Sequence, residues 1–265
     1  MLKTVKHYLA MYWVFIKMCL KSQLEYRFNF IMSILVMCAW LCVKLIYLLV
    51  VYQAKVNING MTPDEILLYV GIATIFSGIM NSMIFPNINR LKKMVRTGDL
   101  DLLIVKPISL QFIGTCRYMR FGLAIPDSIA GVMMIIIAWN RIGLTVSFIK
   151  IFILLMIWSL LIIYSILFLP TLISFWTIKI DAIFEIIWAL WDFNKMPMNI
   201  YNEAIKAIGI YVIPLFVITN FPVLYLLDRM NIGYAIWGII SPIIIFVVLR
   251  LLWIKTIKKY SSASS

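Results

Sequence analysis

Long apolar segments separated by short charged ones run through most of the chain. About 20 apolar residues form a helix long enough to cross a hydrocarbon core of roughly 30 Å. Five windows reach that length, at residues 28–52, 64–85, 117–139, 148–173 and 233–254. One further crossing between residues 174 and 232 gives six spans. The pattern therefore predicts an all-α polytopic membrane protein with six transmembrane helices.

Two windows compete to be the fifth span. Window 204–222 is apolar but contains Pro214 and Pro222. Window 174–195 is apolar with a polar stripe, whose members recur every three or four residues and so share one helix face: Ser174, Thr177, Asp181, Glu185, Trp188, Asp192 and Lys195. Such a helix either lies at a membrane interface or spans with its polar face towards a pathway or a partner. The residue pattern alone leaves both arrangements open.

The N-terminal segment 1–27 has the pattern of a basic amphipathic helix. Four lysines fall near one helical face, and bulky apolar and aromatic side chains fall towards the other: Lys3, Lys6, Lys17 and Lys21 against Tyr8, Met11, Tyr12, Phe15 and Met18. Helices of this kind lie in the membrane interface. No compact apolar core or small-residue cleavage site is visible, so we do not expect a cleavable signal peptide. We assign 28–260 to a single transmembrane domain and 261–265 to a tail.

The distribution of basic residues predicts the orientation. Only 13% of the residues are charged, against about a quarter in soluble domains. Of the 24 Lys and Arg residues, 16 lie in three segments, 1–27, 86–120 and the tail from 250, whereas loops 53–63 and 140–147 hold one each. Basic loops stay in the cytoplasm, so we expect both termini and the 86–117 loop to be cytoplasmic. The bases lie beside apolar spans, so the net charge of +13 does not indicate a nucleic-acid partner.

Two charged residues fall inside predicted spans. A charge at mid-bilayer costs about 2.5–3.5 kcal/mol on insertion scales. Lys44 lies towards the outer end of the first span, where we expect it to snorkel to the interface. Asp127 lies about ten residues into the third span, where we expect a pairing with another span rather than a substrate contact. Small residues at Gly71, Thr74 and Gly78 line one side of the second span and indicate close helix packing.

The loop 86–117 is too long and too mixed in character for a simple connector. Residues 87–98, "NINRLKKMVRTG", are basic and predict a helix along the inner leaflet. Gly98 permits a turn, and Asp99 is placed to cap a new helix of about two turns, "DLDLLIV", which ends before Pro107. Its apolar residues on the cytoplasmic side indicate a docking site for another protein: Leu100, Leu102, Leu103 and Ile104.

The run "GDLDLLIVKPISLQF" resembles the motif G-x-L-D-x-L-x-x-(K/R)-P-(I/L) of a branch of type-2 ATP-binding-cassette (ABC) exporter permeases. Two other stretches are similar to the same branch. "YRFNF" at 26–30 resembles its entry to the first span, and residues 174–227 carry its aromatic and proline pattern: Phe175–Trp176, Pro197, Ile200–Tyr201, Ile213–Pro214 and Phe221–Pro222. The resemblance covers nearly the whole chain in order and spacing.

The resemblance implies a permease with a cytoplasmic coupling helix that seats in a groove of a separate ATPase subunit. The implied coupling residues are Asp99, Leu100, Asp101, Leu102, Leu103, Lys106 and Pro107. It favours window 174–195 as the fifth span, with residues 198–228 as an outer re-entrant segment. Residues implied at the translocation path or dimer interface are Asp127, Asp181, Glu185, Trp188 and Asp192.

The implied assembly contains two permeases and two ATPases in a bacterial cytoplasmic membrane. The second permease is either another copy or a homologue. No G-x-x-x-x-G-K-[ST] sequence occurs in the chain, so ATP and magnesium belong to the partner ATPase and this chain is not itself the enzyme. We expect no cofactor on the chain, and the substrate is not predicted.

Two rival functions remain at the level of sequence. An ion-coupled secondary transporter would use Asp127, Asp181 and Glu185, but we see no internal repeat of the kind common in such carriers. A membrane scaffold without transport is the other rival. Co-purification with an ATPase distinguishes the permease from both.

Overall fold

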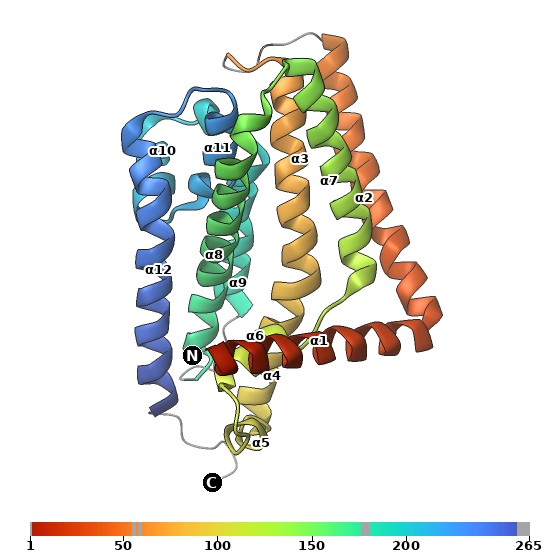
Figure 1. Cartoon of the computed structure of the whole chain (residues 1–265), viewed down its shortest axis with the longest axis vertical. Coiled ribbons are helices and arrows are strands. Elements are labelled where there is room, and N and C mark those ends of the chain that lie inside the picture. Colours follow the sequence, from red (N-terminus) through yellow and green to blue (C-terminus); the bar gives the residue numbers. More distant parts are fainter. Residues whose placement is uncertain (1, 55–56, 58–59, 176–180, 259–265) are drawn as a thin grey trace.

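The computed structural model describes residues 2–54, 57, 60–175 and 181–258, and within these ranges the regular structure is helical without strands. The predicted tail at 261–265 and Thr177 of the polar stripe lie outside the described residues. Helices α2, α3, α7, α8 and α12 stand side by side, and α1 lies across one end of them (Figure 1). We call this end, where α1 begins and α12 finishes, the basic end, and the opposite one the far end.

The α-helices follow one another as α1 (Leu2–Glu25), α2 (Arg27–Ala54), α3 (Pro63–Ile79), α4 (Phe85–Thr97), α5 (Asp101–Ile104), α6 (Leu110–Cys116), α7 (Phe121–Ile142), α8 (Ile149–Ile173), α9 (Asp181–Trp191), α10 (Glu203–Ala207), α11 (Leu215–Leu226) and α12 (Ile232–Lys258). The described residues also form π-helical turns at η1 (Met80–Ile84) and η5 (Ile208–Val212). Short 3₁₀ turns within the same residues are η2 (Val146–Phe148), η3 (Asp192–Lys195) and η4 (Met198–Ile200).

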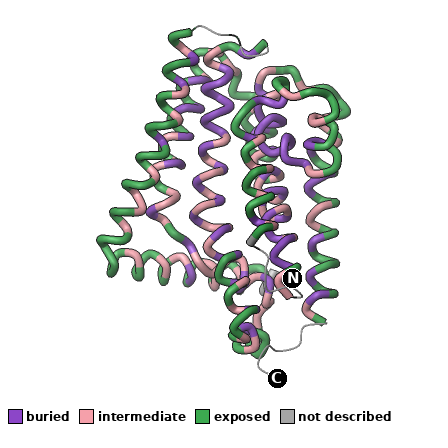
Figure 2. The backbone as a smooth tube through the Cα atoms, turned by 180° about the vertical axis from the view of Figure 1, so that it is seen from behind, coloured by how far each residue is buried: buried purple, intermediate pink, exposed green. Residues whose placement is uncertain are grey.

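Five helical segments of the described chain are long and apolar enough to cross a membrane. They are Arg27–Ala54, Pro63–Thr97, Phe121–Ile142, Val146–Ile173 and Ile232–Lys258, and each contains or overlaps one of the five windows read from the sequence. Much of α2, α7 and α12 is exposed in the single chain, whereas α3 is largely buried (Figure 2). The protein is therefore an all-α polytopic membrane protein built around α3.

The region between α8 and α12 holds a bent pair of helical segments. Residues Glu203–Val212 and Leu215–Leu226 meet at 99°, so window 204–222 is not one straight span. Pro214 lies at the bend, where a helix loses a backbone donor. Both segments are found towards the far end (Figure 1). That position leaves α9 to make the fifth crossing, which stays a prediction because residues 176–180 of window 174–195 lie outside the described residues.

Tyr69 of α3 holds the irregular backbone around η3 and the bent pair. Its side chain is fully buried, and its hydroxyl lies 2.9 Å from the carbonyl oxygens of both Asn194 and Met196 and 3.0 Å from the hydroxyl of Thr219. The Asn220 side chain accepts a bond from the backbone N–H of Met198. Backbone groups without helical partners are tolerated at membrane depth only where protein satisfies them, and these bonds meet that need.

Glycines bring α3 and α7 together at two levels. A Cβ on Gly131 would lie 2.8 Å from the carbonyl oxygen of Gly71, and one on Gly78 would lie 2.9 Å from the Cβ of Asp127. Larger side chains at these positions would push the helices apart. The close packing indicated by the small residues of the second span is therefore present, with α7 as the partner.

Lys44 of α2 and Asp127 of α7 form an ion pair beside this contact. The lysine Nζ lies 3.4 Å from both carboxylate oxygens, and Asp127 is only 2% exposed. Asp127 therefore pairs with another span, as expected from the sequence. The expectation that Lys44 snorkels to the interface is wrong, because its ammonium turns to Asp127 instead.

Helix α1 crosses the basic end of the bundle at a steep angle to the spans (Figure 1). Tyr8 and Phe15 pack against Phe112 of α6. Leu9, Trp13 and Leu24 are exposed and lie within about 60° of helix rotation. One side of α1 thus contacts protein and a second leaves apolar side chains exposed. The location of this second side in the membrane interface stays a prediction.

Helix α4 continues α3 instead of lying along the inner leaflet, so that expectation from the sequence is wrong. Residues Pro63–Thr97 form a single 35-residue helix, whose length of about 52 Å exceeds the roughly 30 Å core. The surplus projects past α1 and carries α5 (Figure 1). Ile88, Leu91 and Val95 are buried against the rest of the protein, which ties this extension to α6 and α8.

Removing either partner of the Lys44–Asp127 pair should destabilise the fold, because it leaves a charge buried without its counterion. We expect Lys44→Met and Asp127→Asn each to lower stability by about 3–5 kcal/mol. The double variant should lose clearly less than the sum of the two. The coupling is measured by heating the purified protein in detergent and recording how much of the folded elution peak remains. Strictly additive losses of stability in the double variant would contradict the pairing.

Candidate coupling surface and polar face

The loop after α4 forms a compact turn at the outermost point of the basic end. Gly98 has a φ of 79° and ends α4 in the left-handed conformation. The Leu100 N–H then donates to the Met94 carbonyl at 3.3 Å. Helix α5 that follows has four residues, about one turn instead of the two expected. We call residues 99–107 the coupling tip.

Asp99 does not cap α5, so that expectation is wrong. The residue at the cap position is Leu100, and no side chain bonds the first turn there. The Asp99 carboxylate accepts instead a bond of 2.6 Å from the Thr97 hydroxyl. Gly98 and the one-turn length of α5 place Asp99 back beside the end of α4.

The apolar residues of the coupling tip divide into a buried and an exposed set. Leu100 and Leu103 are buried inside the chain, whereas Leu102 is 66% exposed and Val105 is 81% exposed. Ile104 is exposed as well. The exposed apolar surface is therefore made by Leu102, Ile104 and Val105, and Leu100 and Leu103 support it from within.

The polar members of the coupling tip lie around this surface. Asp99, Lys106 and Pro107 are exposed and Asp101 is half-buried. The sequence pattern alone did not single out Val105 as an exposed member of this segment, because the leucines were assigned to one outer side. Helical spacing already separates them, since Leu100 and Leu103 are three residues apart and share a face.

Helix α6 connects the coupling tip to the spans. The backbone N–H of Ser109 donates to the hydroxyl of Tyr8 on α1 at 3.2 Å. The Gln111 side chain donates to the Tyr164 hydroxyl of α8 at 3.0 Å and accepts a bond from Arg250 of α12. Burial raises the pKa of the nearby Cys116 thiol, so this residue stays an uncharged packing group at neutral pH. These hydrogen bonds join the chain that leaves the coupling tip to α1, α8 and α12.

Helix α9 keeps an exposed polar face in the single chain. Glu185, Trp188 and Asp192 are all exposed, and Asp192 forms an ion pair of 2.8 Å with Lys195. The Trp188 ring stacks on Phe85 at 4.3 Å between centroids. Asp181 begins α9, but its side chain lies outside the described ones. Asp127 is separate from this face, because it is buried on α7 against Lys44.

Two cavities flank α9. One of about 510 Å³ is lined by polar side chains from several elements together with Phe184 and Trp188: Asn81, Asn89, Lys92, Arg120 and Glu185. The other, of about 310 Å³, lies between α2, α3 and η3 and includes Lys44, Thr74 and Asn194. Among the described residues, the Thr74 hydroxyl and the Asn194 side-chain nitrogen find no hydrogen-bond partner. The two cavities and the exposed face of α9 are surfaces on which another molecule could bind.

The sequence was compared with known protein families, with curated proteins and with solved structures. Residues 38–264 match the family described as ABC-2 family transporter protein. Among curated proteins and among solved structures, the comparisons found no match.

The family match agrees with the long apolar helices and with the resemblance carried by the loop motif. It spans α2 to α12, so it includes the coupling tip and the polar face of α9. Members of this family are membrane components of ABC transporters and are not themselves catalytic. The chain therefore belongs to the ABC-2 transporter family, and it is a multi-pass permease of an ABC transporter.

Proposed function

We propose that this permease is the membrane subunit of an ATP-driven exporter in a bacterial cytoplasmic membrane. Its coupling tip binds a separate ATPase subunit, which holds ATP and magnesium and performs the hydrolysis. Two permeases, either two copies or this chain with a homologue, enclose the path between them. Closure of the ATPases moves the coupling tips and thereby opens that path.

The exposed apolar surface of the coupling tip carries the proposal. Leu102, Ile104 and Val105 are exposed at the end of a helix that extends beyond the bundle. A cluster of exposed apolar side chains that rests on buried residues indicates a binding site for a protein partner. An ATPase groove fits this position, because members of the family work with ABC ATPase subunits.

The polar face of α9 is the observation that favours a second permease in the assembly. Glu185, Asp192 and Lys195 are exposed in the single chain, although α9 runs alongside α8 in the bundle (Figure 1). Charged side chains inside membranes turn towards protein or water and not towards lipid. A second permease, with a water-filled path at the contact, provides that environment.

The basic end is the cytoplasmic side in this proposal. Arg90, Lys93 and Arg96 of α4 are exposed at this end, next to α1 with its own lysines. The far end joins its helices through ion pairs instead, with Arg229 bonded to Glu65 at 2.7 Å and Arg141 to Asp64 at 3.3 Å. The excess of positive charge at one end fits the cytoplasmic rule for basic loops.

Changing Leu102 and Val105 together to Asp should uncouple the permease from its ATPase. Each leucine-sized side chain that leaves an apolar contact forfeits roughly 1.5–3 kcal/mol, so the double variant should bind the ATPase at least a hundredfold more weakly. ATPase pull-down and ATP hydrolysis by the reconstituted complex measure the loss. Val146→Asp is the matched control, because Val146 is also exposed but lies at the far end, and it should bind normally.

The variant Leu100→Ala distinguishes packing inside the coupling tip from direct contact with the ATPase. Leu100 is fully buried, so this change should lower stability by about 2–5 kcal/mol while the folded fraction still binds. Full ATPase binding and activity in the Leu102→Asp/Val105→Asp variant would place the joint elsewhere and refute the assignment of the tip.

Single cysteines should report the orientation in intact cells. In a variant whose four native cysteines are replaced by serine, a membrane-impermeant thiol reagent added from outside should label Asn140→Cys but not Lys93→Cys. Lys93 and Asn140 are both exposed and lie at opposite ends of the helix bundle. Permeabilised cells should label both, and outside labelling of Lys93→Cys would invert the topology.

The polar face of α9 should be reached by water in the assembled transporter. Thiol reagents react with the thiolate, which forms readily only in a polar environment. Glu185→Cys should therefore react at least tenfold faster than Ile129→Cys, which is exposed on the apolar surface of α7. Equal, slow rates in membrane vesicles at both positions would show that α9 faces lipid.

A further inference from the structure

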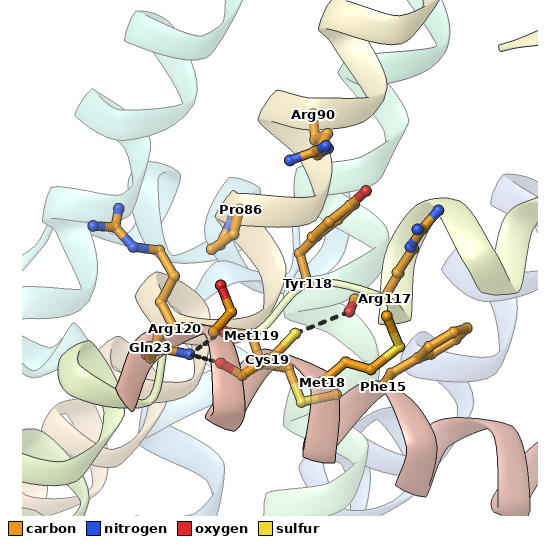
Figure 3. Close-up of a pocket in the computed structure, with 11 residues that line it drawn as sticks. Phe15, Met18, Cys19, Gln23, Pro86, Arg90, Arg117, Tyr118, Met119 and Arg120 are labelled. Atoms are coloured by element: carbon orange, nitrogen blue, oxygen red, sulfur yellow. Dashed lines mark hydrogen bonds between the residues drawn. The ribbon is translucent and has the colours of Figure 1, made fainter. Parts of the chain in front are cut away.

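A groove opens at the basic end between α1, α4 and the link from α6 to α7 (Figure 3). Its volume is about 390 Å³. The apolar part of its lining comes from Phe15, Met18, Pro86 and Met119, and the charged part consists of three arginines, Arg90, Arg117 and Arg120. No acidic side chain lines it. The groove is separate from the coupling tip and from the polar face of α9.

The backbone that forms its rim is fixed by side chains from two directions. From α1, Gln23 donates to the Met119 carbonyl at 2.8 Å and Cys19 donates to the Arg117 carbonyl at 3.3 Å (Figure 3). From α4, Asn87 both donates to the Tyr118 carbonyl at 2.7 Å and accepts from the Tyr118 N–H at 2.8 Å. The link is therefore a fixed structure and its arginine side chains project from a stable frame.

The three guanidinium groups form no ion pair with a carboxylate in the described part of the chain. Two of them share one aromatic ring, with the Arg90 Cζ 4.1 Å and the Arg117 Cζ 5.3 Å from the centroid of Tyr118. Arg120 also lines the neighbouring cavity that contains Glu185. Positive charges gathered without acidic partners favour an anion between them, and the Arg fork bonds phosphate oxygens in pairs.

The position of the groove in the molecule indicates which kind of anionic molecule would bind there. Helix α1 leaves Leu9, Trp13 and Leu24 exposed, which suits a helix lying in the membrane interface and would place the groove at the depth where headgroups meet acyl chains. Met18 is exposed on the rim and gives the groove an apolar edge beside its charged wall. Basic pockets on the cytoplasmic side of membrane proteins bind lipid headgroups.

We propose that this groove is a binding site for the phosphate headgroup of an anionic phospholipid. Arg90 and Arg117 bond the phosphate, and the acyl chains follow the apolar side of α1. The bound lipid joins α1 to α4 and to the start of α7, so it stabilises the basic end from which the coupling tip projects.

The test uses the full-length protein purified in phosphatidylcholine-containing micelles and titrated with phosphatidylglycerol. Native mass spectrometry counts bound lipids, and thermal unfolding reports the stabilisation. The wild type should retain phosphatidylglycerol and gain thermal stability, whereas the double variant R90Q/R117Q should bind it roughly tenfold or more weakly. The control K93Q/R96Q removes the same charge from α4 at residues that do not line the groove, and it should behave as the wild type.

Three outcomes would overturn the proposal. Equal retention of phosphatidylglycerol and phosphatidylcholine by the wild type would show that the headgroup charge is not recognised. Equal loss in R90Q/R117Q and K93Q/R96Q would show attraction by net charge alone. Full competition by free glycerol 3-phosphate at low concentration would assign the site to a soluble phosphate. The elution profile without added lipid checks folding, and the single variants R90Q and R117Q replace the double one if it does not fold.

Discussion

The membrane core supplies no hydrogen-bond partners, so irregular backbone placed there must find its partners within the protein. Tyr69 shows how much depends on this constraint. Its single buried hydroxyl meets two backbone carbonyls and the Thr219 hydroxyl, and so allows the chain to leave helical structure after α9. The bent pair, with Ser159 donating to the Ile218 carbonyl at 2.8 Å, exists only inside the protein shelter made by α3 and α8.

The same constraint marks the places where polar groups are not satisfied within the chain. Lys44 and Asp127 neutralise one another, and Glu65 neutralises Arg229. In contrast, Glu185 on the exposed face of α9 and the arginines of the groove carry charges that form no ion pair within the described part of the chain. The two surfaces differ in sign and in depth, which suits a protein or aqueous neighbour for the first and a lipid headgroup for the second.

The spans could be read from the sequence because each is a local property of 20 to 30 residues. The partner of Asp127 could not, because Lys44 is 83 positions away and only the packing of α2 on α7 brings them together. In the coupling tip, helical spacing groups Leu100 with Leu103 and separates them from Leu102. Which of these two sides is buried could not be read from the sequence, because that depends on α5 being one turn long and on where Gly98 directs it. The fifth crossing was ambiguous for a similar reason, since the bend at Pro214 and the support from Tyr69 are tertiary features.

The continuous helix from α3 to α4 has a mechanical consequence. Its glycine contacts with α7 end at Gly78, which lies about 29 Å from Thr97 along the axis, at 1.5 Å per residue. A tilt of the helix by about 5° at that contact would displace Thr97 by about 2.5 Å. The π-helical turn η1 lies between Gly78 and Thr97, and π-helical turns within α-helices occur frequently at functional sites.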